Sequence, residues 1–368
     1  MEPPRSSSYG CVRSLPPSWR AARAAAVTTL AGAAAVAGLV SWGGQPVAGA
    51  VPASPGIVFV ANYGGTGSTG IAATGSVTSY RVGKSGDLHP LATISAGVSG
   101  PQGVAFDRSG NLWVSNANTN TLVEFTKAAL SQSSPKPVVT ISAGPSGNLN
   151  GPGGLAFDSA GNLWVANTGV TTVVEYPKAE LTKSGAPAPV LTISNNSFNV
   201  PFGVAFDKAG DLWVSDNAQP GSPGVFEYAK SRLGKVVPNP RLTFSLPTTN
   251  GGDDTRTGLA FDPAGNLWVV NSANGSLAEF AKTELARAGA VPRVSISSDS
   301  SGSLGAPNDI SFDSRGDLWV ANTGSSTVVE FVPAELAKSG SPKPLTTIGG
   351  TGTGLNYPMS VVVEPGSE

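Results

Sequence analysis

Histidine and cysteine are nearly missing from this sequence, although these two side chains carry much of the acid–base, nucleophilic and metal chemistry of proteins. His89 is the single histidine and Cys11 the single cysteine among 368 residues. A Ser-His-Asp triad, a histidine general base and a His-ligated zinc ion each need a well-placed histidine. His89 instead occupies a variable position of an internal repeat, which elsewhere holds Lys136, Ala188 and Lys343. The sequence therefore disfavours all three kinds of chemistry.

Oxygen-bearing side chains recur at one position of that repeat, directly after a segment of the Leu-Trp-Val type. They are Asn62, Asn116, Asn167, Asp216, Asn271 and Asn322. Hard cations such as Ca²⁺ and Mg²⁺ prefer amide and carboxylate oxygens, so Asp216, Asn167 and Asn271 are candidate ligands of a divalent metal. The alternative is that each side chain bonds its own turn. The residue pattern leaves both interpretations open.

The start of the repeat is more informative, because function often resides where a repeat departs from its own rule. Most copies begin with Pro-x-Gly. Arg256-Thr257 replaces Pro-x in one copy, and Asn308-Asp309 replaces x-Gly in the next. We predict a polar, asymmetric ligand pocket formed by Arg256, Asn308, Asp309, Gln102, Asp253 and Asp254. Ordinary drift in a surface loop is the alternative.

Two further residue sets suggest chemistry but fit structural roles better. The tryptophans alternate with Leu and Val in the middle of a predicted strand, which indicates core packing and argues against an exposed stacking surface; they are Trp113, Trp164, Trp213, Trp268 and Trp319. One glutamate also recurs in each copy, at positions 124, 175, 227, 279 and 330. Because acid–base pairs must converge on one substrate, glutamates in five separate units indicate structural pairing or solvent exposure.

The elements that position these residues form one repeat. Gly103-Val104-Ala105-Phe106-Asp107 is followed after two residues by Gly110-Asn111-Leu112-Trp113-Val114-Ser115-Asn116, and the unit returns at 154–167, 203–216, 258–271 and 309–322. Copies about 50 residues apart have the length of a four-stranded propeller blade. Each copy predicts four strands: Gly-Val-Ala-Phe-Asp, Asn-Leu-Trp-Val-Ala, Thr-Val-Val-Glu-Phe and a Val-Leu-Thr-Ile run, with a helical turn before the last.

A sixth copy is divided between the two ends of the chain. Residues 56–62 match the Leu-Trp-Val-Ala-Asn strand, with Phe59 in the tryptophan position, and the missing first strand matches 359–364. We therefore predict an all-β fold, a six-bladed β-propeller in which the terminal strand completes the first blade. Such closure removes the two sheet edges that an open row of blades would expose.

The first fifty residues form a separate segment. Four arginines precede the uncharged apolar run 24–40, and Ala48-Gly49-Ala50 supplies small residues suited to cleavage. We predict a signal peptide at 1–50 and a propeller domain at 51–368, in a protein that is secreted or held in the cell envelope. An uncleaved membrane anchor is the alternative, because 24–40 is almost long enough to span a bilayer.

Composition agrees with many short strands and excludes one class of partner. The chain has 47 glycines and 30 prolines, and only 13% of its residues are charged. This composition suits tight turns and does not suit long surface helices. A net charge of −1 supplies no basic footprint for nucleic acid. The expected partner is a small molecule, a glycan or a protein, and contact with a membrane is expected only through an uncleaved N-terminal segment.

The repeating unit Pro-x-Gly-Val-Ala-Phe-Asp, Gly-Asn-Leu-Trp-Val-Ala-Asn, Thr-Val-Val-Glu-Phe resembles the NHL repeat and covers essentially all of 56–364. Similar six-bladed propellers include the gluconolactonase-like family and the streptogramin (virginiamycin B) lyases. The first resemblance implies a divalent metal held by Glu, Asn and Asp at the channel mouth. The second implies a catalytic histidine on the mouth of a late blade, a place that His89 does not match.

Two functions follow from these observations. The first is an exported binding module that uses the channel-mouth face. The alternative is a metal-dependent lactonase or hydrolase of the gluconolactonase-like type, with a Ca²⁺ or Mg²⁺ cofactor that activates water. A propeller scaffold does not decide between them, because this fold supports many activities.

Overall fold

The computed structural model describes residues 56–64, 75–145, 147–217, 224–234, 238–245, 258–285 and 289–366. The chain divides into two units, Met1–Val51 and Pro52–Glu368. The predicted signal peptide and the apolar run 24–40 lie outside the described residues. Within the described part of the chain, no helix has the length and apolar character needed to cross a membrane.

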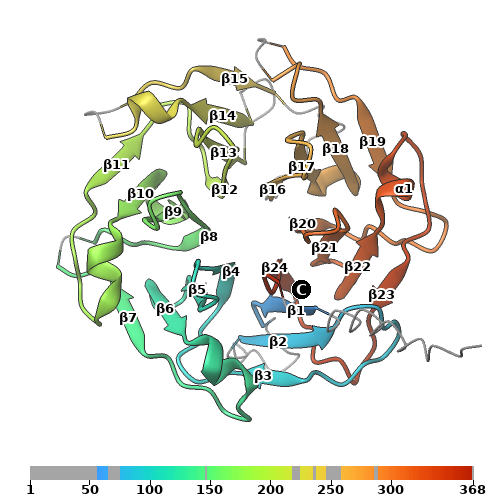
Figure 1. Cartoon of the computed structure of the whole chain (residues 1–368), viewed down its shortest axis with the longest axis horizontal. Helices are drawn as coiled ribbons and strands as arrows, with labels where there is room; N and C mark the ends of the chain where they lie inside the picture. Colours follow the sequence, from blue (N-terminus) through green and yellow to red (C-terminus); the bar gives the residue numbers. More distant parts are fainter. Residues whose placement is uncertain are drawn as a thin grey trace, which may run out of the picture. The chain divides into compact units, whose positions relative to one another are not determined.

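Six four-stranded antiparallel sheets are arranged around a centre, so the fold is a six-bladed β-propeller, as predicted (Figure 1). From its inner to its outer strand, blade 1 consists of β24 (Pro358–Val363), β1 (Ile57–Asn62), β2 (Ser76–Arg81) and β3 (Ala92–Ile94). In the same order, blade 2 consists of β4 (Pro101–Phe106), β5 (Leu112–Asn116), β6 (Thr121–Phe125) and β7 (Val139–Ser142). Blade 3 consists of β8 (Pro152–Phe157), β9 (Leu163–Asn167), β10 (Thr172–Tyr176) and β11 (Leu191–Ser194).

The second half of the ring repeats this order. Blade 4 consists of β12 (Pro201–Phe206), β13 (Leu212–Asp216), β14 (Val225–Tyr228) and β15 (Leu242–Phe244). Blade 5 consists of β16 (Leu259–Phe261), β17 (Leu267–Asn271), β18 (Ser276–Phe280) and β19 (Val294–Ser297). Blade 6 consists of β20 (Pro307–Phe312), β21 (Leu318–Asn322), β22 (Thr327–Phe331) and β23 (Thr346–Ile348). Short helices occupy some of the connections, namely η1 (Lys127–Ser131), η2 (Thr168–Val170), η3 (Lys178–Thr182), η4 (Lys230–Arg232), η5 (Ser272–Asn274) and α1 (Pro333–Leu336).

The two ends of the propeller domain share blade 1. β24 pairs antiparallel with β1, with Val58 opposite Val363 and Val60 opposite Val361. The backbone N–H of Tyr63 donates to the carbonyl of Tyr357 over 3.0 Å and extends the contact beyond the strands. The predicted closure of the first blade by the last strand is confirmed.

Aromatic residues join neighbouring blades. Four of the five tryptophans meet the phenylalanine that ends the first strand of the next blade, edge to face: Trp113 with Phe157, Trp164 with Phe206, Trp213 with Phe261 and Trp268 with Phe312. The ring centroids are 5.8 to 6.2 Å apart. Trp319 is buried in the same cluster as Val58 and Val60 of blade 1, and Val363 packs against it where the other blades have phenylalanine. The tryptophans are therefore core residues, as the strand pattern predicted.

Candidate functional site

The strand ends that carry the predicted metal ligands lie on one face of the ring, termed the loop face. On this face the second strand of each blade turns into the third, and the connection from the preceding blade enters the first strand. Asn116 shows the arrangement: its Oδ1 accepts from the N–H of Ser99 over 3.0 Å, and its Nδ2 donates to the carbonyl of Gly97 over 2.8 Å. Its side chain therefore ties the connection from the preceding blade to β5.

The same bonds recur around the ring. Asn167 accepts from Asn150 N over 2.7 Å and donates to Asn148 O over 2.8 Å. Asn322 donates to Ser303 O over 3.0 Å, and Asn62 accepts from Asn356 N over 3.2 Å. The alternative drawn from the sequence was a bond to the residue's own turn, and these side chains make such a bond as well. Asn116 Nδ2 donates to Thr121 Oγ1 over 3.2 Å, and Asn322 Nδ2 donates to Thr327 Oγ1 over 3.2 Å. The backbone partners given above belong to the inter-blade connection, which lies beside the strand end.

Asp216 is the one acidic member of this set. Its carboxylate accepts from the N–H of Asn199 over 2.9 and 3.1 Å. Burial raises the pKa of Asp216 to about 6, against the opposing effect of backbone hydrogen bonds from Asn199 and Val200. Asn167, Asp216 and Asn271 end β9, β13 and β17 in three different blades. A metal ion held by these three residues stays a prediction, because the contacts of Asn167 and Asp216 are those of structural clamps.

The centre of the ring contains a cavity of about 340 Å³ to which all six inner strands contribute. Polar atoms make up more than half of its exposed wall. The lining includes Gln102, Val104 and Phe106 from β4, Val204 from β12, Asp309, Ile310, Ser311 and Phe312 from β20, and Ser360 and Val361 from β24. Small-molecule sites in proteins typically occupy about 300 to 1,000 Å³ and combine an apolar wall with a few polar groups.

Among the described residues, Asp309 is the single ionisable one in the lining of this cavity. Its position near the start of an inner strand holds glycine in blades 2 to 5, and the reason is steric. A Cβ placed on Gly154 would lie 2.6 Å from the carbonyl oxygen of Phe202, and one on Gly258 would lie 2.4 Å from Asp309 Oδ1. In blades 6 and 1 the position holds Asp309 and Ser360, which contact each other instead.

Hydrogen bonds from neighbouring residues hold the Asp309 carboxylate. Ser360 Oγ donates to Oδ2 over 2.5 Å, and the N–H of Val361 donates to the same oxygen over 3.4 Å. Burial is the largest effect on this group and raises the pKa of Asp309 to about 6, although the bonds from Ser360, Ile310 and Val361 lower it. Asp309 forms no ion pair with any residue that the structure describes.

The structure brings two of the six predicted pocket residues together at the cavity. Gln102 and Asp309 both line it. Asn308 is buried toward blade 1, where its Nδ2 donates to Met359 Sδ over 3.4 Å, and its Oδ1 has no partner among the described residues. Arg256, Asp253 and Asp254 lie outside the described residues. Ser360 was missed, although its signal is in the sequence: it replaces glycine at the same position as Asp309.

Carboxylates also gather on the opposite face, termed the turn face, where the first strand of each blade turns into the second. In blade 2, Asn111 Nδ2 donates to Asp107 Oδ2 over 3.0 Å and to Glu124 Oε1 over 2.8 Å, so one amide bridges two acids. Asn162 does the same for Asp158 and Glu175. The predicted structural pairing of these glutamates is what the structure has in both blades.

Where the bridging asparagine is replaced by aspartate, an arginine is present. In blade 4, Asp207, Asp211 and Glu227 lie with ligand oxygens within 4.8 Å of one another, a spacing that could suit a metal ion. Arg241 contacts Glu227 and Asp211, the latter over 3.3 Å. The guanidinium group therefore supplies the positive charge that this cluster needs.

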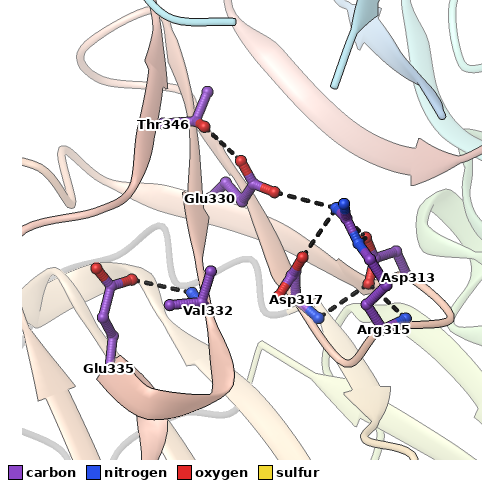
Figure 2. Close-up of polar contacts among 7 residues, drawn as sticks. All are labelled: Asp313, Arg315, Asp317, Glu330, Val332, Glu335 and Thr346. Atoms are coloured by element: carbon purple, nitrogen blue, oxygen red, sulfur yellow. Dashed lines mark hydrogen bonds and ion pairs between the residues drawn. The ribbon is translucent and has the colours of Figure 1, made fainter. Parts of the chain in front are cut away.

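Blade 6 reaches the same result with an arginine from the turn itself (Figure 2). Arg315 lies 2.8 Å from both Asp313 and Asp317 and 3.4 Å from Glu330. Thr346 donates to the other oxygen of Glu330. Arg315-Gly316-Asp317 spells a tripeptide known from integrin ligands, but Asp317 is buried and both charged side chains are engaged within the blade.

Comparison with known proteins supports the fold. No protein-family model and no curated protein sequence matches the chain. A periplasmic gluconolactonase of Pseudomonas aeruginosa superposes with a TM-score of 0.57 at 18% identity, over 84% of this chain and 85% of that one. A putative 6-phosphogluconolactonase from Bacteroides fragilis gives 0.54 at 12% identity, over 85% and 99%.

Other solved structures share the architecture. A chain of the nidogen/laminin complex gives a TM-score of 0.54 at 12% identity, over 84% of this chain and 98% of that one. The virginiamycin B lyase of Staphylococcus aureus gives 0.45 at 12% identity, over 64% and 67%. At these identities the likeness is one of fold. It agrees with the propeller fold that the repeat predicted.

Proposed function

We propose that the protein is an exported binding module that holds a small molecule in the central cavity, entered from the loop face. One observation supports this above the others: the cavity has the size of a small-molecule site and, among the described residues, contains a single ionisable side chain, Asp309. The repeat places glycine at that position in four blades, so the charged residue breaks the symmetry of the ring. A concave site with a few polar groups in fixed places is the usual design of a selective small-molecule site.

Export rests on the N-terminal segment and on one similar structure. The arginines before 24–40 and the small residues at 48–50 have the layout of a cleaved signal. The gluconolactonase from Pseudomonas aeruginosa is described as periplasmic. N-terminal sequencing of material recovered outside the cytoplasm tests the proposal. A chain starting near Val51 supports a released protein, and a chain that still carries 24–40 supports an anchored one.

Filling the cavity tests the binding function directly. Ser311 is a small, half-buried lining residue, so Ser311→Trp would place an indole in the cavity. Ser301→Trp makes the same change in an exposed loop on the loop face and serves as the control. The full chain is incubated with a metabolite extract, and retained compounds are identified by native mass spectrometry. We expect a compound retained by wild type and the control but not by Ser311→Trp. Identical retention by all three proteins would contradict the proposal.

The second candidate is a metal-dependent lactonase or hydrolase with Ca²⁺ or Mg²⁺, and the close carboxylates Asp207, Asp211 and Glu227 are the observation in its favour. Arg241 already neutralises that cluster, and it lies on the turn face, away from the clamps at Asn167 and Asp216. Metal analysis of the purified full chain separates the candidates. A stoichiometric divalent ion that is lost in Asp216→Ala would favour the enzyme, and no such ion is expected for the binding module.

A further inference from the structure

The described residues of the central cavity carry an unbalanced charge. Asp309 projects from β20 into the lining, and no other described lining residue is acidic or basic. The strands packed against β20 do not change this, because β16, β21 and β24 contain no titratable side chain. A carboxylate held away from water costs free energy unless it is paired with a cation or protonated. The cavity therefore favours a positively charged occupant.

The wall determines which kind of cation fits. Ca²⁺ takes six to eight oxygen ligands, whereas the described side chains of the lining supply, besides the Asp309 carboxylate, only the amide of Gln102 and the hydroxyls of Ser311 and Ser360. The aliphatic part of the wall comes from side chains that are themselves largely buried, namely Val104, Val204, Ile310 and Val361. Burial of apolar surface against such a wall is favourable by roughly 25 cal/mol per Å². An organic cation with an aliphatic body satisfies both the carboxylate and the wall.

The geometry of Asp309 leaves one oxygen available. Ser360 Oγ donates to Oδ2, and the N–H of Val104 donates to Ser360 Oγ over 3.3 Å, which fixes the hydroxyl in place. Oδ1 lies over Gly258, where the missing Cβ leaves room for it. No side chain among the described residues donates to Oδ1. Ser360 is therefore a positioning residue, and Oδ1 is the acceptor offered to a ligand.

We propose that the cavity binds a small primary ammonium compound with an aliphatic body, whose ammonium group donates a hydrogen bond to Asp309 Oδ1. This inference rests on the proposed binding function and adds the chemical class of its ligand. It assigns Asp309 to selectivity for charge, Ser360 to holding the carboxylate, and the valine and isoleucine side chains to contact with the aliphatic body.

Binding of the ammonium group should depend on pH in one direction. The cation is attracted to the ionised carboxylate, and burial raises the pKa of Asp309 to about 6. Selectivity for the cation is then present above pH 6 and lost as the pH falls through that value. The described elements packed against Asp309 contribute no other titratable group, so a single titration step is expected.

Three probes of equal size and different charge test the inference: n-butylammonium, 1-butanol and butyrate. Their dissociation constants are measured with the full chain by isothermal titration calorimetry at pH 8 and pH 5. A hydrogen bond to a charged group is worth about 1.5–3 kcal/mol, so butylammonium should bind roughly 10- to 100-fold more tightly than butanol at pH 8. Butyrate should bind most weakly. The preference for butylammonium should shrink at pH 5.

Variants of the full chain isolate the two side chains. Asp309→Asn keeps the shape and should bind butylammonium and butanol equally, whereas Asp299→Asn, a carboxylate change on the loop face outside the cavity lining, should keep the preference. Ser360→Ala removes a bond that lowers the pKa of Asp309, so its preference should disappear at a higher pH than in wild type. Thermal unfolding checks that each variant is folded, and Ser360→Ala keeps the test informative if Asp309→Asn does not fold.

The failures of the two proposals differ. Equal binding of all three probes to wild type, blocked by Ser311→Trp, would overturn the ammonium inference and leave the binding function in place. Retention of extract compounds that Ser311→Trp does not affect would overturn the binding function itself. A preference that appears only in Arg256→Ala would show that Arg256 neutralises Asp309, and a Ca²⁺ ion that displaces butylammonium would show a metal site; either result overturns the inference.

Discussion

Carboxylates lie near both ends of the inner strands, and their partners differ between the two faces. On the turn face, each described acid cluster has a partner from its own blade: an asparagine amide in blades 2 and 3, and an arginine in blades 4 and 6. Near the loop face, Asp309 has a serine hydroxyl and a backbone N–H but no cation among the described residues. On the turn face, where the acids stabilise the blades, the described carboxylates are therefore matched by partners that donate hydrogen bonds or carry positive charge.

The contrast separates structural acids from a functional candidate. The cluster at Asp207, Asp211 and Glu227 has the spacing of a metal site, but its neighbours explain it as an arginine-bridged turn. Asp309 is a single carboxylate at a position where four other blades have glycine. What distinguishes it from the turn-face acids is that no balancing charge lies beside it among the described residues. Each prediction below changes one side of this balance.

Arg241→Ala should cause the largest loss of stability. It would leave three carboxylates together without a cation, and breaking a buried ion pair commonly costs about 3–5 kcal/mol. Because about half of the Arg241 side chain is exposed, we expect about 2–3 kcal/mol at pH 7. The double variant Arg241→Ala/Asp211→Asn should recover much of that loss, because asparagine bridges the two acids at this position in blades 2 and 3. Urea unfolding of the four proteins of this cycle measures the effect.

Arg293→Ala is the matched control. Arg293 pairs with Glu279 in blade 5, where Asn266 occupies the position of Asp211 and donates to Asp262 over 2.8 Å. Without Arg293, the cluster in blade 5 contains one carboxylate fewer than the cluster that Arg241→Ala leaves in blade 4. The loss of stability should therefore be clearly smaller. Equal losses for Arg241→Ala and Arg293→Ala would show that repulsion among the acids is not the cause.

Asp309→Asn should stabilise the protein above pH 6. The pKa of Asp309 is raised in the folded state, from an ordinary value of 3.8 to about 6, so between these values the folded state binds more protons than the unfolded state. Stability contributed by this group therefore falls as the pH rises from about 4 to about 6. We expect a gain of about 1–2 kcal/mol at pH 8 and almost none at pH 4. A gain that is equal at both pH values would mean that Asp309 is not titrating in this range.

The fold could be predicted from the sequence, and the reason is repetition. Five tryptophans at the same position of the repeat and six Asn or Asp residues at strand ends mark the blades. An error in assigning the strands of one copy therefore does not affect the other copies. The closure was visible because residues 359–364 match the strand that the first copy lacks. Such signals are local in each copy, and the ring follows when six similar sheets pack through Trp–Phe contacts.

The site could be predicted only in part. Asp309 and Gln102 were found at the starts of inner strands, and both line the cavity. Asn308 departs from the repeat in the same way as Asp309, but its side chain packs against Met359 in the next blade, and the repeat does not tell which way a side chain turns at the bulge between Pro307 and Asp309. Ser360 was missed because its copy is the most divergent. The arginine partners of the turn face come from different positions, Arg241 and Arg315, so no single motif marks them.

Asp216→Asn separates the effect of a buried charge from that of the cavity. The substitution restores the residue that the other blades have, and the introduced amide should donate to the carbonyl of Ser197, which corresponds to Gly97, Asn148 and Ser303. Because burial raises the pKa of Asp216 to about 6, we expect a gain of about 1 kcal/mol at pH 8 that fades below pH 5. Chemical denaturation at the two pH values measures it. Unlike Asp309→Asn, this change should leave the preference for butylammonium intact, and a loss of that preference would link Asp216 to the cavity.

Tyr176→Phe should have the smallest effect on stability. It serves as a reference for Asp309, because Tyr176 carries a buried polar group that lies outside the cavity. The Tyr176 hydroxyl is buried without a partner among the described residues, whereas Tyr228 in the same position of blade 4 accepts a bond from Asn195. An unsatisfied buried hydroxyl costs free energy, so its removal should stabilise the protein by about 0.5–1 kcal/mol. The gain should be the same at pH 5 and pH 8, because burial raises the pKa of Tyr176 far above that range. Tyr228→Phe, which breaks a hydrogen bond, should destabilise, and if both variants behaved alike the hydroxyl of Tyr176 would have to be bonded. The Tyr176 hydroxyl is a buried polar group outside the cavity. Unlike Asp309, it should give a stability effect that does not depend on pH and should bind no ligand.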